Sequence, residues 1–209
     1  MDKTLFRKEL LARRNQMFAA LANDRTTACN IEKIAQCFQN FIPEQTCYKN
    51  AENILVYVSY NSEFPTRQLI EDSIACGKRV YVPKVEGKRH MEFYEIKRLN
   101  DLVEGYQGIL EPTGNEPVFD PATQSAVMFV PGLAFCKNTS LGIYRIGYGG
   151  GYYDTYLKKT VRDRVFTIGI GYDFQIVDKL PLEEHDETID TIYYYNTMKN
   201  EMEEILWQQ

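Results

Sequence analysis

The segment from residue 145 to 154, RIGYGGGYYD, carries the residue types best suited to chemistry. Four of the five positions from Gly147 to Gly151 are glycine, Arg145 precedes them and Asp154 follows them. Backbone N–H groups of a glycine-rich turn that enters a helix attract an anion, and the missing side chains let a phosphate come close. A carboxylate there suits Mg²⁺, which binds one or two protein carboxylates together with phosphate oxygens. The segment therefore predicts a nucleotide phosphate site with a bound metal.

Other interpretations of this segment stay open on these residues alone. It lacks the G-x-x-x-x-G-K-[ST] spacing, and we expect a polar loop before the glycines, whereas a dinucleotide fingerprint directly follows a strand. The glycines could form only a tight turn with positive φ angles. Asp154 could simply offset the helix dipole, and Arg145 could be a solvated loop residue.

Cations in the N-terminal helix give an independent indication of an anion. At about 100° per residue, Lys3, Arg7 and Arg14 project within about 40° of one another. The apolar side chains on both sides of them are Phe6, Leu10, Leu11, Met17 and Phe18. Charged residues of a helix usually lie on its solvated outer face, whereas these three lie inside the apolar stripe. We therefore expect them to reach toward a shared anion. The alternative is that their stems pack and their charged ends reach water.

The elements that must position these groups alternate between strands and helices, which is typical of an α/β fold. The expected helices cover residues 3–20, 24–40, 66–77 and 150–159, and the expected strands cover 53–60, 79–84, 126–135 and 165–172. Residues 53–84 have the pattern of a βαβ unit, and 90–96 resembles an antiparallel addition. The Gly-, Pro- and Asp-rich stretch 100–125 is expected to be a long surface connection.

Composition limits the possible partners of the protein. The chain has 209 residues with 44% hydrophobic and 25% charged residues, which favours a single globular domain over 1–209. A net charge of −5 gives no general attraction to nucleic acid or anionic lipid. The five cysteines form no C-x-x-C pair, and no signal peptide or long apolar run is present, so we expect a cytoplasmic protein with reduced thiols. The expected partners are small molecules, with no nucleic acid, no membrane and no obligate protein partner.

Two motifs, VPGLAF at 130–135 and RIGYGGGYYDTYL at 145–157, resemble those of the 5-formyltetrahydrofolate cyclo-ligases, also called 5,10-methenyltetrahydrofolate synthetases. Further matches to this family are Lys3 with Arg7, Glu63 with Thr66, Pro83 with Lys84, and the segment HDETID at 185–190. The sequence departs from the family at Cys136, where aspartate is usual. The loop at 137–144 also is about two residues longer, so Gly142 does not take the place of the motif's glycine.

The resemblance implies a single Rossmann-like three-layer α/β domain, with a mainly parallel sheet and helices on both faces. It also implies an ATP- and Mg²⁺-dependent ligase that converts 5-formyltetrahydrofolate to 5,10-methenyltetrahydrofolate, ADP and phosphate through an iminium phosphate. The ligands would lie at the carboxyl ends of the strands.

Site residues are implied position by position. The ATP site would consist of Lys3, Arg7, Arg145, Ile146, Gly147, Tyr148, Gly149, Gly150, Gly151, Tyr152 and Tyr153. The folate site would consist of Val58, Glu63, Tyr148 and Tyr152. Arg145 and Asp154 would be catalytic, and Asp154 and Asp186 would hold Mg²⁺. His185 is expected to be solvated and is assigned no role.

Two other functions compete with this interpretation. A non-catalytic folate- or nucleotide-binding paralogue would keep the fold without the reaction, although the retained set of charged residues disfavours it. A phosphosugar isomerase of similar fold is disfavoured by the basic N-terminal helix, which indicates a larger anion.

Overall fold

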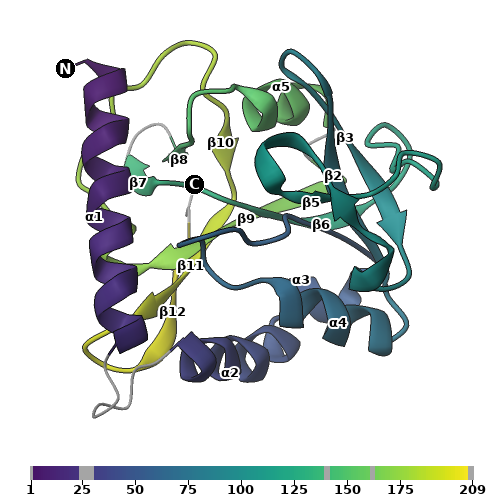
Figure 1. Ribbon diagram of the computed structural model, residues 1–209, viewed down its shortest axis with the longest axis horizontal. Helices are drawn as coiled ribbons and strands as arrows, with labels where there is room; N and C mark the ends of the chain where they lie inside the picture. Colours follow the sequence, from purple (N-terminus) through teal and green to yellow (C-terminus); the bar gives the residue numbers. More distant parts are fainter. Residues whose placement is uncertain (1, 24–30, 139–141, 161–162, 207–209) are drawn as a thin grey trace.

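A computed structural model describes residues 2–23, 31–138, 142–160 and 163–206. Its main sheet has seven strands in the order β12-β11-β9-β6-β1-β2-β3 (Figure 1). The strands are β1 Asn53–Val56, β2 Arg79–Gly87, β3 His90–Ile96, β6 Ala126–Val130, β9 Val165–Tyr172, β11 Thr191–Asn196 and β12 Glu201–Leu206. The five inner strands pair in parallel, and β3 and β12 add antiparallel edges. The expected α/β class with a mainly parallel sheet is therefore confirmed.

Strand burial explains why these segments form the centre of the sheet. All four residues of β1 and all five of β6 are buried, as expected for strands that are covered on both faces. On one face, α2 Ile31–Phe41, α3 Thr46–Asn50 and α4 Arg67–Ala75 pack over the sheet, at the bottom of Figure 1. On the opposite face lie α5 Tyr152–Lys159 and a small antiparallel sheet. The three-layer arrangement is confirmed, with the small sheet sharing the second face with α5.

The small sheet has the order β10-β8-β7, from β7 Ala134–Asn138, β8 Gly142–Ile146 and β10 Thr188–Ile189. The polar loop expected before the glycines is wrong, because residues 134–138 and 142–146 pair as antiparallel strands. A strand, β8, therefore directly precedes Gly147. The expected strand 126–135 divides at Pro131, as its Pro-Gly pair predicted.

Helix α1, Lys3–Asn23, stands beside the main sheet at the left of Figure 1. Its Leu10 packs with Leu133, Ala134 and Ile146, which lie in or next to the small sheet. The expected helix 3–20 is confirmed and is three residues longer at its C-terminus. The expected start of the second helix at Asp24 lies outside the described residues. None of the described helices is long and apolar enough to cross a membrane.

Two expected elements have different bounds. The strand expected over 53–60 ends at Val56, because the next backbone groups bond to a side chain. The Thr66 hydroxyl donates to Tyr57 O at 2.6 Å and accepts from Ser59 N at 3.0 Å. The connection 100–125 contains a small hairpin of β4 Val103–Glu104 and β5 Leu110–Glu111. The final strand β12 was not expected from the sequence.

The parallel strands leave one edge of the sheet ready to bind a ligand. From β1 the chain first goes outward to β2, and then continues on the other side of β1 through β6, β9 and β11. The strand order thus reverses between β1 and β6. In open α/β sheets, ligands bind at the carboxyl ends of the strands beside such a reversal.

Candidate functional site

A cavity of about 1020 Å³ opens at the carboxyl ends of β1, β2 and β6. Val58 follows β1, Pro83 and Val85 belong to β2, and Pro131 follows β6; all four line the cavity. Helix α1, the β2–β3 hairpin, the connection at 106–111 and the glycine segment supply the other walls. The cavity therefore lies where the strand order predicts a ligand site.

Every residue that the sequence predicted for the site lines this one cavity. These residues are Lys3, Arg7, Val58, Glu63, Arg145, Ile146, Gly147, Tyr148, Gly149, Gly150, Gly151, Tyr152, Tyr153, Asp154 and Asp186. They come from α1, the loop after β1, the β8–α5 segment and the segment before β10, which are far apart in sequence. The structure brings them together, and their individual roles remain predictions.

The glycine segment forms the turn between β8 and α5. Gly149 has φ +102° and Gly151 has φ +71°, which a residue with a side chain rarely adopts. Gly151 is the residue preceding α5, and Tyr152 is its first helical residue, two positions later than expected. The free N–H groups at the start of α5 therefore border the cavity.

Arg145 lies beneath the glycine segment with only 3% of its side chain exposed. Its Nη2 donates to Asp154 Oδ1 at 3.2 Å, and its guanidinium carbon lies 5.2 Å from the centroid of the Tyr153 ring. Arg145 Nε is buried and has no hydrogen-bond partner among the described residues. The expectation of a solvated arginine is excluded, and a fixed positive charge with an unused donor lies at the floor of the segment.

The α1 cations point into the cavity. Lys3 Nζ donates to Asp186 Oδ2 at 2.8 Å and to Glu183 Oε2 at 2.9 Å. Arg7 Nε donates to Gly147 O at 3.1 Å. Lys3 and Arg7 therefore line the same cavity, and their binding of a shared anion stays a prediction.

Arg14 makes a more extensive set of contacts than either of them. Only 2% exposed, it donates from Nε to Ser62 Oγ at 3.1 Å and from Nη1 to Gly132 O at 3.4 Å. Its Nη2 donates to Tyr148 Oη, and its guanidinium carbon lies 5.3 Å from the centroid of that ring. The sequence placed Arg14 on the correct helix face but did not predict that it joins the two halves of the site.

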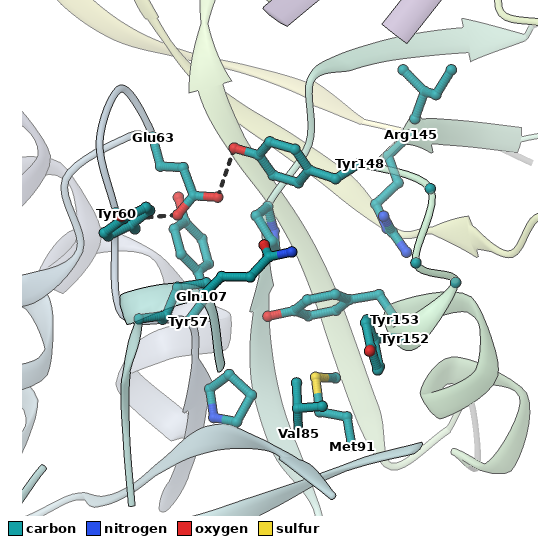
Figure 2. Close-up of a pocket in the computed structure, with 18 of the residues that line it drawn as sticks. Tyr57, Tyr60, Glu63, Val85, Met91, Gln107, Arg145, Tyr148, Tyr152 and Tyr153 are labelled. Atoms are coloured by element: carbon teal, nitrogen blue, oxygen red, sulfur yellow. Dashed lines mark hydrogen bonds between the residues drawn. The ribbon is translucent and has the colours of Figure 1, made fainter. Parts of the chain in front are cut away.

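Glu63 lies opposite the glycine segment. Tyr148 Oη donates to Glu63 Oε1 at 3.0 Å and Tyr60 N donates to Glu63 Oε2 at 3.0 Å; Figure 2 shows both bonds. Burial in the cavity wall raises the pKa of Glu63, and the hydrogen bonds from Tyr60 and Tyr148 and the charge of Arg14 oppose that rise. Glu63 is therefore a carboxylate acceptor held at the wall of a deep cavity, and it is not an ordinary surface turn residue.

Aromatic and apolar side chains form the wall between Glu63 and α5. Figure 2 shows the Tyr153 ring extending into this space, with Tyr57, Val85 and Met91 around it. Tyr153 Oη is buried without a hydrogen-bond partner among the described residues, and burial raises its pKa, so it stays protonated and can donate. The space between the two polar ends of the cavity thus suits a flat, largely apolar ligand.

The connection at 100–125 contributes to the site in a way that the sequence did not predict. Tyr106 and Gln107 line the cavity, and the Tyr106 ring centroid lies 6.3 Å from that of Tyr152. Gln107 has φ 57°, an unusual value for a residue with a side chain. The sequence patterns of the strand at 53–60 and of the glycine motif do not predict which connection lies against these two segments.

Carboxylates gather at the end of the cavity nearest Lys3. Glu187 N donates to Asp154 Oδ1 at 3.4 Å, which places the segment of Asp186 next to the start of α5. Asp154 Oδ2 accepts no hydrogen bond from the described residues. Glu183, His185 and Asp186 also place potential ligand atoms within 4.8 Å of one another. Hard oxygen donors suit Mg²⁺, and Lys3 now bonds both oxygens of Asp186.

Comparison with known proteins agrees with this geometry. The sequence profile of the 5-formyltetrahydrofolate cyclo-ligase family matches residues 1–195. A protein of Schizosaccharomyces pombe named as a probable 5-formyltetrahydrofolate cyclo-ligase is 30% identical over 202 residues, covering 90% of this chain and 95% of the relative. The cyclo-ligase of Escherichia coli is 31% identical over 138 residues, covering 65% of this chain and 74% of the relative.

A solved structure is similar over nearly the whole chain. The NMR structure of Aquifex aeolicus 5,10-methenyltetrahydrofolate synthetase superposes with a TM-score of 0.73 at 26% identity, covering 93% of this chain and 90% of that one. The sequence match over residues 1–195 and the relative at 30% identity show that the chain belongs to the 5-formyltetrahydrofolate cyclo-ligase family.

Proposed function

We propose that this protein is a ligase that uses ATP to cyclise 5-formyltetrahydrofolate to 5,10-methenyltetrahydrofolate, releasing ADP and phosphate. One observation carries the proposal beyond family membership. A single cavity joins a glycine turn surrounded by arginines to a carboxylate, Glu63, across an aromatic wall. The first end suits a polyphosphate, and the second suits the N–H groups of a pterin.

The reaction explains why both ends must share one cavity. The formamide oxygen of the substrate is a poor leaving group. Transfer of the γ-phosphoryl group from ATP to that oxygen gives an N5-iminium phosphate and ADP. The N10 lone pair then attacks the formyl carbon, the carbon–oxygen bond breaks with release of phosphate, and N10 loses its proton. Phosphoryl transfer depends mainly on positioning and charge stabilisation, which this cavity can supply.

At the phosphate end, we assign the residues to binding and charge neutralisation. Lys3 and Arg7 from α1, Arg145, and the backbone of residues 146–153 would hold the triphosphate. The unused Arg145 Nε is a donor that the protein itself does not satisfy, which supports this assignment. Charge-assisted hydrogen bonds from these groups would stabilise the developing negative charge on the transferred phosphoryl group.

At the folate end, we assign Glu63 to the pterin, with Val58, Tyr148 and Tyr152 contacting its rings. Tyr153 Oη is a neutral donor between the two ends, so it is suited to contact the formyl group or the transferring phosphoryl group. The bonds that Glu63 now accepts from Tyr148 and Tyr60 would be exchanged for bonds to the substrate.

We further propose that Asp154 and Asp186 hold Mg²⁺. Asp154 and Asp186 both line the cavity, and carboxylate oxygens are the donors that Mg²⁺ prefers, so the chemistry of these two residues suits the ion. The ion would neutralise charge on the triphosphate and orient it. Lys3 would then turn from Asp186 toward the phosphates.

The test of the proposed activity is direct. Purified protein is incubated with 5-formyltetrahydrofolate, ATP and Mg²⁺, and the absorbance of the methenyl product is followed. A rise in absorbance that needs the protein, 5-formyltetrahydrofolate and MgATP together supports the proposal. Without a rise, a melting temperature that still increases with ATP would identify the competing function, a binding protein without catalysis.

Two broader assignments are also proposals. Residues 1–209 would act as one catalytic domain, because the cavity takes residues from Lys3 to Asp186. Cytoplasmic location is proposed from the cysteines, of which Cys37, Cys47, Cys76 and Cys136 are free thiols. A relative from Arabidopsis thaliana carries the name of a mitochondrial enzyme, so localisation of the tagged protein is the appropriate test.

A further inference from the structure

Alternate glycines of the phosphate segment each contact a different guanidinium group. A β-carbon placed on Gly147 would lie 2.9 Å from Arg145 Nη1, and one on Gly149 would lie 3.3 Å from Arg7 Cζ. A β-carbon on Gly151 would lie 3.6 Å from Arg89 Nε. The three arginines come from β8, α1 and the β2–β3 hairpin. A side chain would collide with Arg145 at Gly147 and be tight against Arg7 at Gly149, whereas at Gly151 it would only touch Arg89, so three arginines lie beside this turn.

Arg89 differs from the other two arginines in its contacts. Arg145 is paired with Asp154, and Arg7 donates to Gly147 O. Arg89 makes no hydrogen bond or ion pair with the described residues. The carboxylates nearest to it in sequence already have partners: Glu86 accepts from Tyr94, and Glu92 accepts from Lys159. Arg89 thus presents an uncompensated positive charge at the mouth of the cavity, next to the start of α5.

The backbone at Arg89 supports a functional reason for this placement. Gly87 pairs with His90, so Lys88 and Arg89 form the tip of the hairpin, and Arg89 has φ 58°. Glycine or asparagine adopts this left-handed conformation more easily, and an arginine there costs on the order of 1 kcal/mol. Arg89 is exposed at the hairpin tip, and its side chain lines the cavity despite this unfavourable backbone conformation.

We propose that Arg89 binds the polyphosphate of the nucleotide, so that the β2–β3 hairpin forms a third side of the phosphate site. This inference rests on the proposed function and adds a residue to its nucleotide site. The start of α5 favours negative charge through its free N–H groups and its dipole. An anion there would satisfy those groups and Arg89 together. The other anion in the proposed reaction is the glutamate carboxylate of the folate, which is the alternative ligand of Arg89.

The experiment compares two neighbouring cations. Arg89→Gln and Lys88→Gln each remove one positive charge from the hairpin tip, but Lys88 does not line the cavity. Isothermal titration with MgATP measures affinity without requiring turnover. We expect R89Q to raise the Kd for MgATP by roughly fivefold or more, because it removes a direct charge-assisted bond to the phosphates. K88Q removes only a more distant, screened charge, so it should raise the Kd by less than about twofold. R89K should recover part of the affinity. Equal effects of R89Q and K88Q would overturn the proposal.

Two further measurements separate the alternatives. The KM for 5-formyltetrahydrofolate is compared with that for 5-formyltetrahydropteroate, which lacks the glutamate. If R89Q raises only the KM of the glutamate-containing substrate and leaves the ATP Kd unchanged, Arg89 binds the carboxylate and the phosphate assignment is wrong. Arg89→Gly removes both the strain and the cation, so it should weaken ATP binding without lowering the melting temperature. A wild-type protein that binds ATP but forms no product would refute the proposed activity and leave the Arg89 test intact.

Discussion

Tyr148 Oη donates a hydrogen bond to Glu63 Oε1 at 3.0 Å, so the glycine segment and the loop after β1 are joined across the cavity. Arg14 holds the Tyr148 ring and hydroxyl from α1. The carboxylate assigned to the pterin and the turn assigned to phosphate are therefore connected through one phenol. Substrate that bonds Glu63 must therefore compete with Tyr148.

Replacing Tyr148 by phenylalanine should change the pH dependence of folate binding. The phenol hydrogen bond lowers the pKa of Glu63, against burial, which raises it. Without that bond the pKa of Glu63 should rise further, so Glu63 takes up its proton at a higher pH and becomes a neutral, weaker acceptor. As the pH is lowered, the KM for 5-formyltetrahydrofolate should therefore begin to increase at a higher pH in Y148F than in the wild type.

A matched control is Tyr194→Phe, since the Tyr194 hydroxyl bonds Glu203 at the β11–β12 edge and not in the cavity. Y194F should keep the wild-type pH profile. An unchanged profile in Y148F would contradict the assignment of Glu63 to the folate.

Glu63→Gln should weaken folate binding and spare ATP. Glutamine keeps the size of the side chain but loses the charged acceptor, so we expect the KM for 5-formyltetrahydrofolate to rise roughly tenfold. The KM for ATP should stay within about twofold, because the amide oxygen of glutamine can still accept the hydrogen bond from Tyr148. Steady-state kinetics with each substrate varied in turn tests this. A larger effect on ATP than on folate would mean that the two ends are reversed.

The same variant should gain relative stability as the pH rises. Because the pKa of Glu63 is raised by burial, the folded state binds its proton more readily than the unfolded state. Stability of the wild type therefore decreases as pH rises from the ordinary carboxyl range through the raised pKa. E63Q lacks this titration, so its free energy of unfolding relative to the wild type should increase over that window. Urea unfolding at a series of pH values measures it, and a constant difference would exclude the raised pKa.

Arg7→Gln should weaken ATP more than folate. The Arg7 guanidinium lies beside Gly149, and its Nε donates to Gly147 O, so its loss removes a cation and one hydrogen bond to the turn. We expect the KM for ATP to rise roughly tenfold, from the loss of a charge-assisted contact. Arg13→Gln, on the exposed side of the same helix, is the control and should have little effect. Similar kinetics for R7Q and R13Q would show that Arg7 only packs.

Asp154→Asn should impair both the metal site and the fold around Arg145. Asparagine is a poor Mg²⁺ ligand here, so turnover should fall by roughly a hundredfold or more, and residual activity should need a higher Mg²⁺ concentration. The change also leaves the Arg145 charge without its carboxylate, which should lower the free energy of unfolding by about 2 kcal/mol, because Asp154 is only partly buried. A wild-type Mg²⁺ dependence in D154N would refute the metal assignment.

The sequence by itself determined the local features of this protein. The runs ILV at 54–56 and AVMFV at 126–130 are apolar at every position, which is typical of strands that are covered on both faces. The glycines at 147–151 and the spacing of Lys3, Arg7 and Arg14 on one helix face likewise follow from local geometry. These features predicted the α/β class, one βαβ unit and the two basic parts of the site, whereas the mainly parallel three-layer sheet was expected partly from the family resemblance.

The tertiary structure alone decided which distant segments close the cavity. Arg89 and Gln107 line the cavity because the β2–β3 hairpin and the 106–111 connection pack near the glycine turn. No local sequence pattern predicts this packing. The pairing of β8 with β7 and β10 was missed for the same reason, since short strands are stabilised by their neighbours more than by their own composition. Spacing along the chain fixes the direction of a side chain from its own helix or strand, whereas its partner across the cavity depends on how all the elements pack together.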